Sequence, residues 1–333
     1  MSASPTAFRQ VGNQLIFIAT EASSGTELWK TDGTSAGTQI LKDINPGLIS
    51  SGLSYIAYLN NDTLLFVADD GTNGKGVWMT NGTLAGTHIV KDINPGATGS
   101  DPTNVFEMNG EVFFFANDGV IGNEFWKTDG TAAGTVLVKN INTSSGSSSF
   151  GSGFTRVSDT LLFSATDGIN GNELWRTDGT TTGTYIVKDI IPGNASSFPG
   201  VMRSLGSICV FTADSTGTGN ELWRTDGTAA GTYRLGDFYP GAGGSSFFFF
   251  TTLNGKAYGR ANVPGSGGTE MWKTDGTVAG TQLVKDFVTG GVFGSPILIT
   301  NLNGVLFIST TSSLANGYEL WKSDGTTSGT VFL

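Results

Sequence analysis

The stretch Glu173-Leu174-Trp175-Arg176-Thr177-Asp178-Gly179-Thr180 contains the pattern that decides the fold. Each of the seven tryptophans of the chain occupies the third position of such a stretch: Trp29, Trp78, Trp126, Trp175, Trp223, Trp272 and Trp321. Successive tryptophans lie 48 or 49 residues apart. Spacing this regular identifies seven copies of one repeat.

The residues on either side of the fourth tryptophan predict short strands. The run 161–165 precedes the motif and the run 185–188 follows it, and both are rich in apolar and β-branched residues. Asp-Gly, Asn-Gly and Pro-Gly pairs bound these runs, as turns bound strands. No window has a helical period. Four strands in a unit of 40–50 residues is typical of a propeller blade. We therefore expect an all-β fold, a seven-bladed β-propeller of four-stranded antiparallel blades.

The repeat boundaries predict one domain over residues 1–333. The expected blades are 5–47, 48–96, 97–143, 144–193, 194–241, 242–290 and 291–333. Each copy begins at its first strand and ends after its fourth, so each blade should be nearly self-contained. We expect the first and last blades to pack on each other with little or no strand exchange, because a closed ring leaves no sheet edge exposed.

The bulk composition excludes several partners. The net charge is −10 and the pI about 4.5, whereas nucleic acids and anionic membranes attract basic surfaces. One cysteine and one histidine cannot form the usual zinc sites. Neither a signal peptide nor an apolar run of membrane-spanning length is visible. We expect no nucleic-acid partner and no membrane insertion.

The motif residues have a structural and a functional interpretation. Six copies carry the glutamate, the Lys or Arg, and the turn aspartate, whereas the second copy has Gly76, Met79 and Asn81. This joint loss predicts that the three charges form one ion-paired cluster in each blade. The motif aspartates are Asp32, Asp129, Asp178, Asp226, Asp275 and Asp324. Seven equivalent ligand sites are possible, but a role in packing and turns is favoured, because every repeat must keep what stacks it.

Metal and catalytic chemistry find little support in the sequence. The loop from Asp167 to Glu173 has the oxygens and glycines of a calcium loop, yet its acidic spacing does not fit, so a glycine-rich hairpin is favoured. We expect no cofactor, with calcium as the alternative. His88 should be a surface or packing residue and Cys209 an inert buried thiol.

Positions where the copies differ are the candidates for ligand binding. Arg9, Arg156 and Arg203 fall on first strands, which line the channel of a propeller, and could hold an anion or a sugar. Alternatively they pair with carboxylates such as Glu107. Arg260 follows the run 247–250, four phenylalanines that could form a partner-binding patch or repack locally. The variable linkers 46–54, 143–154 and 241–247 are a further candidate.

The motif resembles the signature of the bacterial ELWxxDGT-repeat proteins. The resemblance covers almost the whole chain, and Glu173-Leu174-Trp175 followed by Asp178-Gly179-Thr180 carries it. It implies a propeller-like repeat array in exported or surface proteins of bacteria. It implies no particular activity.

Three functions remain open at this point. A non-enzymatic binding or assembly module of a bacterial extracellular or cell-surface protein is favoured, with protein–protein interaction as its task. A glycan-binding, lectin-like propeller is the alternative. A carbohydrate-active hydrolase or lyase is the third, and it needs two carboxylates about 5–10 Å apart, a pair that the sequence does not nominate.

Overall fold

A computed structural model describes residues 3–144, 153–262, 268–287, 294–311 and 317–333. The chain forms two compact units, Met1–Ser149 and Phe150–Leu333, each of which is described by itself. The described residues contain strands and turns and no helix, and hence no helix able to cross a membrane.

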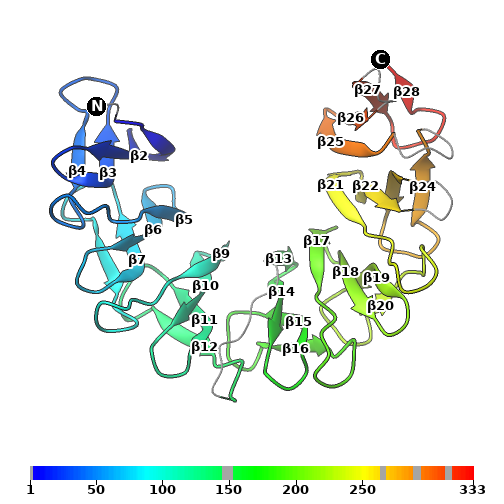
Figure 1. Cartoon of the computed structure of the whole chain (residues 1–333), viewed down its shortest axis with the longest axis horizontal. Coiled ribbons are helices and arrows are strands. Elements are labelled where there is room, and N and C mark those ends of the chain that lie inside the picture. The colour runs from blue at the N-terminus through cyan, green and yellow to red at the C-terminus, as the bar shows by residue number, and fades with distance from the viewer. Residues whose placement is uncertain (1–2, 145–152, 263–267, 288–293, 312–316) are drawn as a thin grey trace. The chain divides into compact units, whose positions relative to one another are not determined.

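Unit 1 contains three four-stranded sheets, each an antiparallel meander in chain order (Figure 1). Blade 1 consists of β1 (Thr6–Val11), β2 (Gln14–Glu21), β3 (Gly25–Thr31) and β4 (Gln39–Lys42). Blade 2 consists of β5 (Ser54–Asn60), β6 (Thr63–Asp69), β7 (Lys75–Thr80) and β8 (His88–Lys91). Blade 3 consists of β9 (Thr103–Met108), β10 (Glu111–Asn117), β11 (Asn123–Thr128) and β12 (Val136–Lys139).

Unit 2 contains four further sheets of the same order. Blade 4 consists of β13 (Thr155–Val157), β14 (Thr160–Thr166), β15 (Asn172–Thr177) and β16 (Tyr185–Lys188). Blade 5 consists of β17 (Gly200–Ser204), β18 (Cys209–Ser215), β19 (Gly219–Thr225) and β20 (Tyr233–Arg234). Blade 6 consists of β21 (Phe248–Leu253), β22 (Lys256–Asn262), β23 (Thr269–Thr274) and β24 (Gln282–Lys285). Blade 7 consists of β25 (Pro296–Leu302), β26 (Val305–Thr311), β27 (Tyr318–Ser323) and β28 (Val331–Phe332).

The second strand of each inner blade is buried on both faces, as the apolar runs predicted. Val210 and Phe211 of β18 are fully buried although they lie on opposite faces of the sheet, Val210 against blade 6 and Phe211 against blade 4. Only a blade covered on both sides has this pattern. Apolar burial at about 25 cal/mol per Å² is the main stabilising contribution in such a stack.

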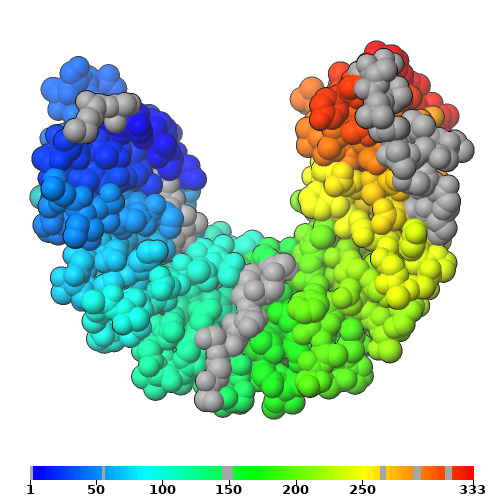
Figure 2. All heavy atoms as spheres, in the orientation of Figure 1, coloured from blue at the N-terminus to red at the C-terminus, as the bar shows by residue number. Residues whose placement is uncertain are grey.

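Neighbouring blades within a unit lie directly against one another (Figure 2). They meet through the same two faces each time. In unit 1, Ile16 and Leu28 of blade 1 pack against Leu64, Phe66 and Trp78 of blade 2. In unit 2, blades 4 and 5, 5 and 6, and 6 and 7 repeat this arrangement. The packing of the first blade on the last stays a prediction.

Five motif tryptophans lie in the layers between blades of one unit, as predicted: Trp78, Trp126, Trp223, Trp272 and Trp321. Five of the seven are buried, with 5–8% of their surface exposed, whereas Trp29 and Trp321 are half-buried. Trp223 packs on blade 4 and Trp272 on blade 5. The tryptophan is therefore an interblade packing residue and not an exposed aromatic platform.

The meander gives each blade two different ends. The turn between the first and second strands and the loop between the third and fourth strands lie at one end, because the strands are antiparallel. The turn between the second and third strands and the linker to the next blade lie at the other end. We call these the loop end and the linker end.

Candidate functional site

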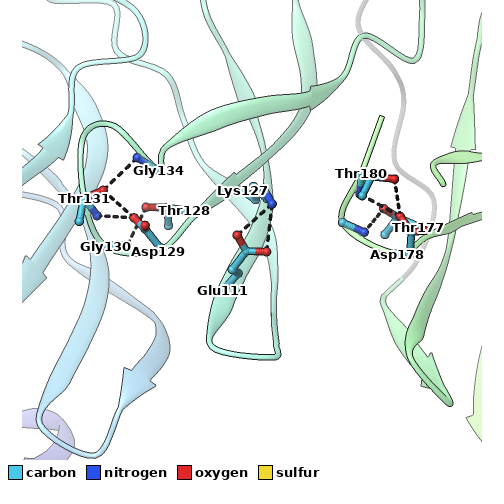
Figure 3. A network of polar contacts seen from close by, with 11 residues as sticks. Glu111, Lys127, Thr128, Asp129, Gly130, Thr131, Gly134, Thr177, Asp178 and Thr180 are labelled. Carbon is cyan, nitrogen blue, oxygen red and sulfur yellow. Dashed lines mark hydrogen bonds and ion pairs between the residues drawn. The ribbon is translucent and has the colours of Figure 1, made fainter. Parts of the chain in front are cut away.

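The loop between the third and fourth strands is held by the same hydrogen bonds in all seven blades (Figure 3). In blade 4, Asp178 Oδ1 accepts from Thr180 N at 2.9 Å and from Thr180 Oγ1 at 2.7 Å. Gly183 N donates to Thr180 Oγ1 at 2.9 Å. Thr177 and Thr184 share a hydroxyl–hydroxyl bond of 2.7 Å. The aspartate therefore serves the turn.

These hydrogen bonds keep the motif aspartates ionised. The hydroxyl and then the amide of the threonine two residues on lower the pKa of Asp32, Asp129 and Asp178. In blade 2, Asn81 Oδ1 accepts the same two bonds from Thr83, at 3.1 and 2.7 Å. An amide oxygen thus replaces the carboxylate without loss of the turn.

The motif glutamate lies at the linker end and binds the linker. Glu173 Oε2 accepts from Ile190 N at 3.0 Å and from Ser197 Oγ at 2.5 Å, and Glu173 Oε1 accepts from Ser197 N at 2.9 Å. Glu27 makes the same three bonds to Ile44 and Ser51. Burial raises the pKa of both glutamates despite these donors.

The predicted cluster of motif Glu, Lys or Arg, and Asp is wrong. Glu173 and Asp178 are five residues apart on an extended strand, which separates them by about 16 Å. Arg176 lies on the opposite face from Glu173, and its Nη1 donates to the Gly227 carbonyl of blade 5 at 3.1 Å. Lys273 reaches the Gly325 carbonyl of blade 7 in the same way. In blade 3, Lys127 pairs with Glu111 instead, at 2.9 Å (Figure 3).

The glycine-rich hairpins use their aspartates internally. Asp167 Oδ1 accepts from the amides of Ile169 and Asn170, both at 2.8 Å, and Asp167 Oδ2 accepts from Asn170 Nδ2. Asp118 accepts from two amides in the same manner. Within the described ranges, no three His, Cys, Asp or Glu side chains gather as a metal site would require. A role for calcium stays a prediction.

The histidine is exposed and the cysteine is buried. His88 is exposed on β8. Cys209 is fully buried on β18 as a free thiol, and burial raises its pKa to about 12. A thiol with so high a pKa is not a nucleophile at neutral pH, so the interpretation of an inert buried thiol is supported.

The candidates Arg9, Glu107 and Arg156 lie on the first strands of blades 1, 3 and 4 and bond within their own hairpins. Arg9 Nη1 donates to the neighbouring Phe8 carbonyl at 2.9 Å. Glu107 Oε1 accepts from Gly110 N at 2.9 Å. Arg156 Nε donates to the Ser158 carbonyl, and its Nη2 lies 3.5 Å from Asp159. Their part in ligand binding stays a prediction.

The candidates Arg203 and Arg260 are both brought to the first strand of blade 6. Arg203 Nη2 donates to the Phe249 carbonyl of β21 at 3.1 Å. The Arg260 guanidinium lies 5.9 and 5.7 Å from the ring centres of Phe248 and Phe250, within cation–π distance. Arg260 Nη1 also donates to the Pro296 carbonyl of blade 7 at 2.9 Å.

The four phenylalanines of this segment alternate in burial. Phe247 and Phe249 are 2% exposed and pack on blade 5, which bears out the local repacking. Phe248 is 45% exposed. On the next first strand, Ile297 and Leu298 are 40% and 55% exposed. We call these three side chains the inner apolar patch.

Strand register shows that this patch is particular to blades 6 and 7. Phe248 pairs with Arg260, and Leu298 pairs with Ser309, at one equivalent position of the blade. The equivalent first-strand residues of blades 1, 2, 3 and 5 are Thr6, Ser54, Thr103 and Gly200. Small or polar residues therefore occupy this position in blades 1, 2, 3 and 5.

A polar groove that the sequence analysis missed lies at the loop end between blades 1 and 2. It has a volume of about 490 Å³ and is lined by Gln10, Gly12, Asn13, Tyr58, Asn61 and Asp62. A second hollow of about 350 Å³ shares Gly12 and Asn13 and reaches Asn81 and Thr83. The signal in the sequence was the extra residue in the blade 2 hairpin, Asn60-Asn61-Asp62, where blade 1 has Gly12-Asn13.

Comparison with known proteins supports the fold and nothing finer. No protein-family description and no curated protein matches the chain. A prolyl endopeptidase structure aligns with 99% of this chain and 49% of its own, at 12% identity and a TM-score of 0.50. Puromycin hydrolase aligns at 13% identity and a TM-score of 0.46, over 99% of this chain and 53% of its own.

The β-propeller domain of the trilobed protease from Pyrococcus furiosus aligns over 96% of this chain and 95% of its own, at 12% identity and a TM-score of 0.42. The chain thus spans about half the length of the two peptidases above. The predicted fold, a seven-bladed β-propeller of four-stranded antiparallel blades, is confirmed.

Proposed function

We propose that this propeller is a non-enzymatic module that binds a protein partner through the inner apolar patch. The observation that carries the proposal is the exposure of Phe248, Ile297 and Leu298 on two neighbouring first strands. Single exposed apolar residues are ordinary, but a group of them on one rigid element is typical of an interaction surface. Blades 1, 2, 3 and 5 pack with a small or polar residue at the position of Phe248 and Leu298, so a blade does not need a large apolar side chain there.

The surroundings of the patch favour a partner with an apolar segment next to a carboxylate. Arg260 stands where the other second strands have uncharged residues, and it lies against the rings of Phe248 and Phe250. An arginine beside exposed aromatic rings is a frequent composition of interface centres. The rest of the chain is acidic, which discourages nonspecific contact with other acidic proteins.

We also propose that the module acts in an exported or surface protein, since its motif resembles that of such repeat proteins. Antibody labelling of intact cells against lysed cells tests this location. Added protease serves as a second measure of accessibility. An epitope that becomes accessible to antibody and to protease only after lysis would argue against the surface location.

Site-specific photocrosslinking in the native cell tests the partner proposal. A photoreactive residue at position 248 or 298 should capture one defined protein, whereas the same residue at the exposed Val278 on a loop of blade 6 should not. The purified partner should then bind the double variant Phe248→Ser/Leu298→Thr at least tenfold more weakly than wild type. Binding unaffected by the double variant, or equal capture from position 278, would refute the proposal.

A further inference from the structure

The polar groove between blades 1 and 2 exists because blade 2 has an irregular first hairpin. In blade 1, Val11 is the buried last residue of β1 and pairs with Gln14 across a two-residue turn. In blade 2, Leu59 takes the packing position, and Asn60 follows it before pairing with Thr63. The register shift between Tyr58 and Asn60 is a β-bulge, a feature that often re-aims side chains at functional sites.

The bulge places Tyr58, Asn61 and Asp62 against the turn of blade 1. A Cβ added at Gly12 would lie 3.8 Å from Asp62 Oδ1, so the two hairpins approach closely there. Gly12 has a φ of +55°, which favours glycine, and its missing side chain leaves the groove open. Tyr58 is 40% exposed, so much of its side chain is accessible to solvent.

The side chains that line the groove have the hydrogen-bonding capacity of a sugar site. The amides of Gln10, Asn13 and Asn61 each donate and accept, as ligands with many hydroxyl groups require. Asp62 supplies a carboxylate that can accept from two adjacent hydroxyls. The Tyr58 ring supplies an apolar face for the C–H groups of a sugar ring. No Lys or Arg lines the groove, which disfavours an anionic ligand.

The adjoining hollow extends this chemistry in the one blade whose motif changed. Asn81 stands where the other six copies have an ionised aspartate, and Thr83 is next to it. The neutral amide preserves the turn and removes one negative charge from the rim. Gln14 also lines this hollow, and its Oε1 is buried without a hydrogen-bond partner among the described residues. An unpaired buried acceptor is costly unless a ligand or water donates to it.

We propose that this groove binds a neutral carbohydrate, with Tyr58 under the sugar ring and Asp62, Asn61 and Asn13 on its hydroxyls. The volume of about 490 Å³ lies within the common range of roughly 300–1,000 Å³ for small-molecule sites. The site is in unit 1, whereas the inner apolar patch is in unit 2. The two proposals therefore stand or fall separately.

The test is a glycan array probed with the full chain, followed by calorimetric titration of the strongest neutral oligosaccharide. Tyr58→Ala and Asp62→Ala should each raise its Kd at least tenfold. Asp159→Ala, at the turn of the blade 4 hairpin in unit 2 and likewise exposed to solvent, is the matched control and should leave the Kd unchanged. Thermal melting of each variant verifies folding. Phe248→Ser/Leu298→Thr should bind the sugar as wild type does.

Three results would overturn the carbohydrate proposal. They are no neutral glycan bound at millimolar concentration, a preference for acidic glycans alone, or binding that Tyr58→Ala and Asp62→Ala leave intact. A more conservative variant, Asp62→Asn, retains the volume and should give a smaller loss than Asp62→Ala. This variant keeps the test decisive if Asp62→Ala lowers the melting temperature.

Discussion

The two ends of each blade are held by hydrogen bonds of different range. At the loop end, the side-chain hydrogen bonds that shape the Asp-Gly-Thr loop from within join residues no more than seven positions apart, and all seven copies make the complete set. The bonds from Arg176 and Lys273 to the glycine carbonyl of the next blade's loop are additions to this local set. At the linker end, the motif glutamate binds residues 17 and 24 positions further on. Each copy of the Asp-Gly-Thr loop contains both partners of every bond that shapes it. The motif glutamate depends instead on the linker that follows the blade.

The linker end is accordingly the variable one. Glu27 and Glu173 accept three bonds each. Glu270 accepts a bond from Phe287 N at 3.2 Å, and its Oε1 is buried without a partner in the described part of the chain. Blade 2 has Gly76 in place of the motif glutamate. Changes at this end alter how one blade is tied to the next.

The largest expected effect comes from removing a fully bonded glutamate. Glu173→Ala leaves the Ile190 amide and the buried Ser197 hydroxyl without the acceptor that the carboxylate supplies, at about 1–3 kcal/mol for each donor. The Ser197 amide keeps the Asn172 carbonyl, at 3.1 Å. We expect chemical denaturation to show a loss of roughly 3–5 kcal/mol. Glu21→Ala, at an exposed strand end, is the control and should change stability by less than about 0.5 kcal/mol. A loss at Glu173 no larger than that of the control would contradict the long-range clamp.

A smaller loss is expected from Gly183→Ala at the loop end. The new Cβ would lie 2.0 Å from Asp178 Oδ1, so the carboxylate must leave and give up its bonds to Thr180. Two hydrogen bonds at about 0.5–1.5 kcal/mol each predict a loss of roughly 1–3 kcal/mol. Urea unfolding measures it. An equal loss of stability for Gly183→Ala and Glu173→Ala would show that the sequence separation of the bonded residues does not determine how much each end contributes.

The weakly bonded glutamate predicts a pH dependence. Burial raises the pKa of Glu270 from 4.5 to about 7. A raised folded-state pKa means that this group stabilises the fold fully below about pH 4.5, and that the contribution is lost as the pH rises toward 7. Glu270→Gln has no charge to bury, so its melting temperature should vary less between pH 5 and pH 8. An unchanged difference between the two pH values would argue that Glu270 is ionised throughout.

The smallest effect on stability is expected for Asp178→Asn, because blade 2 already has an asparagine at this position. Asp178→Asn should change stability by less than about 0.5 kcal/mol, because an amide oxygen accepts the same two bonds in blade 2. Thermal melting of the variant measures it. Asp178→Ala, which has no acceptor, should be clearly less stable than Asp178→Asn. Equal melting temperatures for the two variants would show that the aspartate bonds contribute little.

The ion-pair prediction failed for a reason that strand geometry explains. The joint absence of Glu, Lys or Arg, and Asp from blade 2 suggested one cluster, but the three positions span five residues of an extended strand and point to different faces. Asn81 keeps its turn, Met79 packs against the layer between blades 2 and 3, and Gly76 simply lacks the clamp. The three differences in blade 2 therefore lie at positions with separate structural roles.

The sequence by itself determined the repeat, the four strands of each blade, the Asp-Gly-Thr turn and the burial of most motif tryptophans. These features depend on alternation, turn residues and spacing, which are local and recur in every copy. Only the tertiary structure decided the partners of the motif glutamate, the meeting of Arg203 and Arg260 at β21, and the groove beside Tyr58. These depend on residues from different blades, whose distances are set by the stacking of sheets and leave no period in the chain.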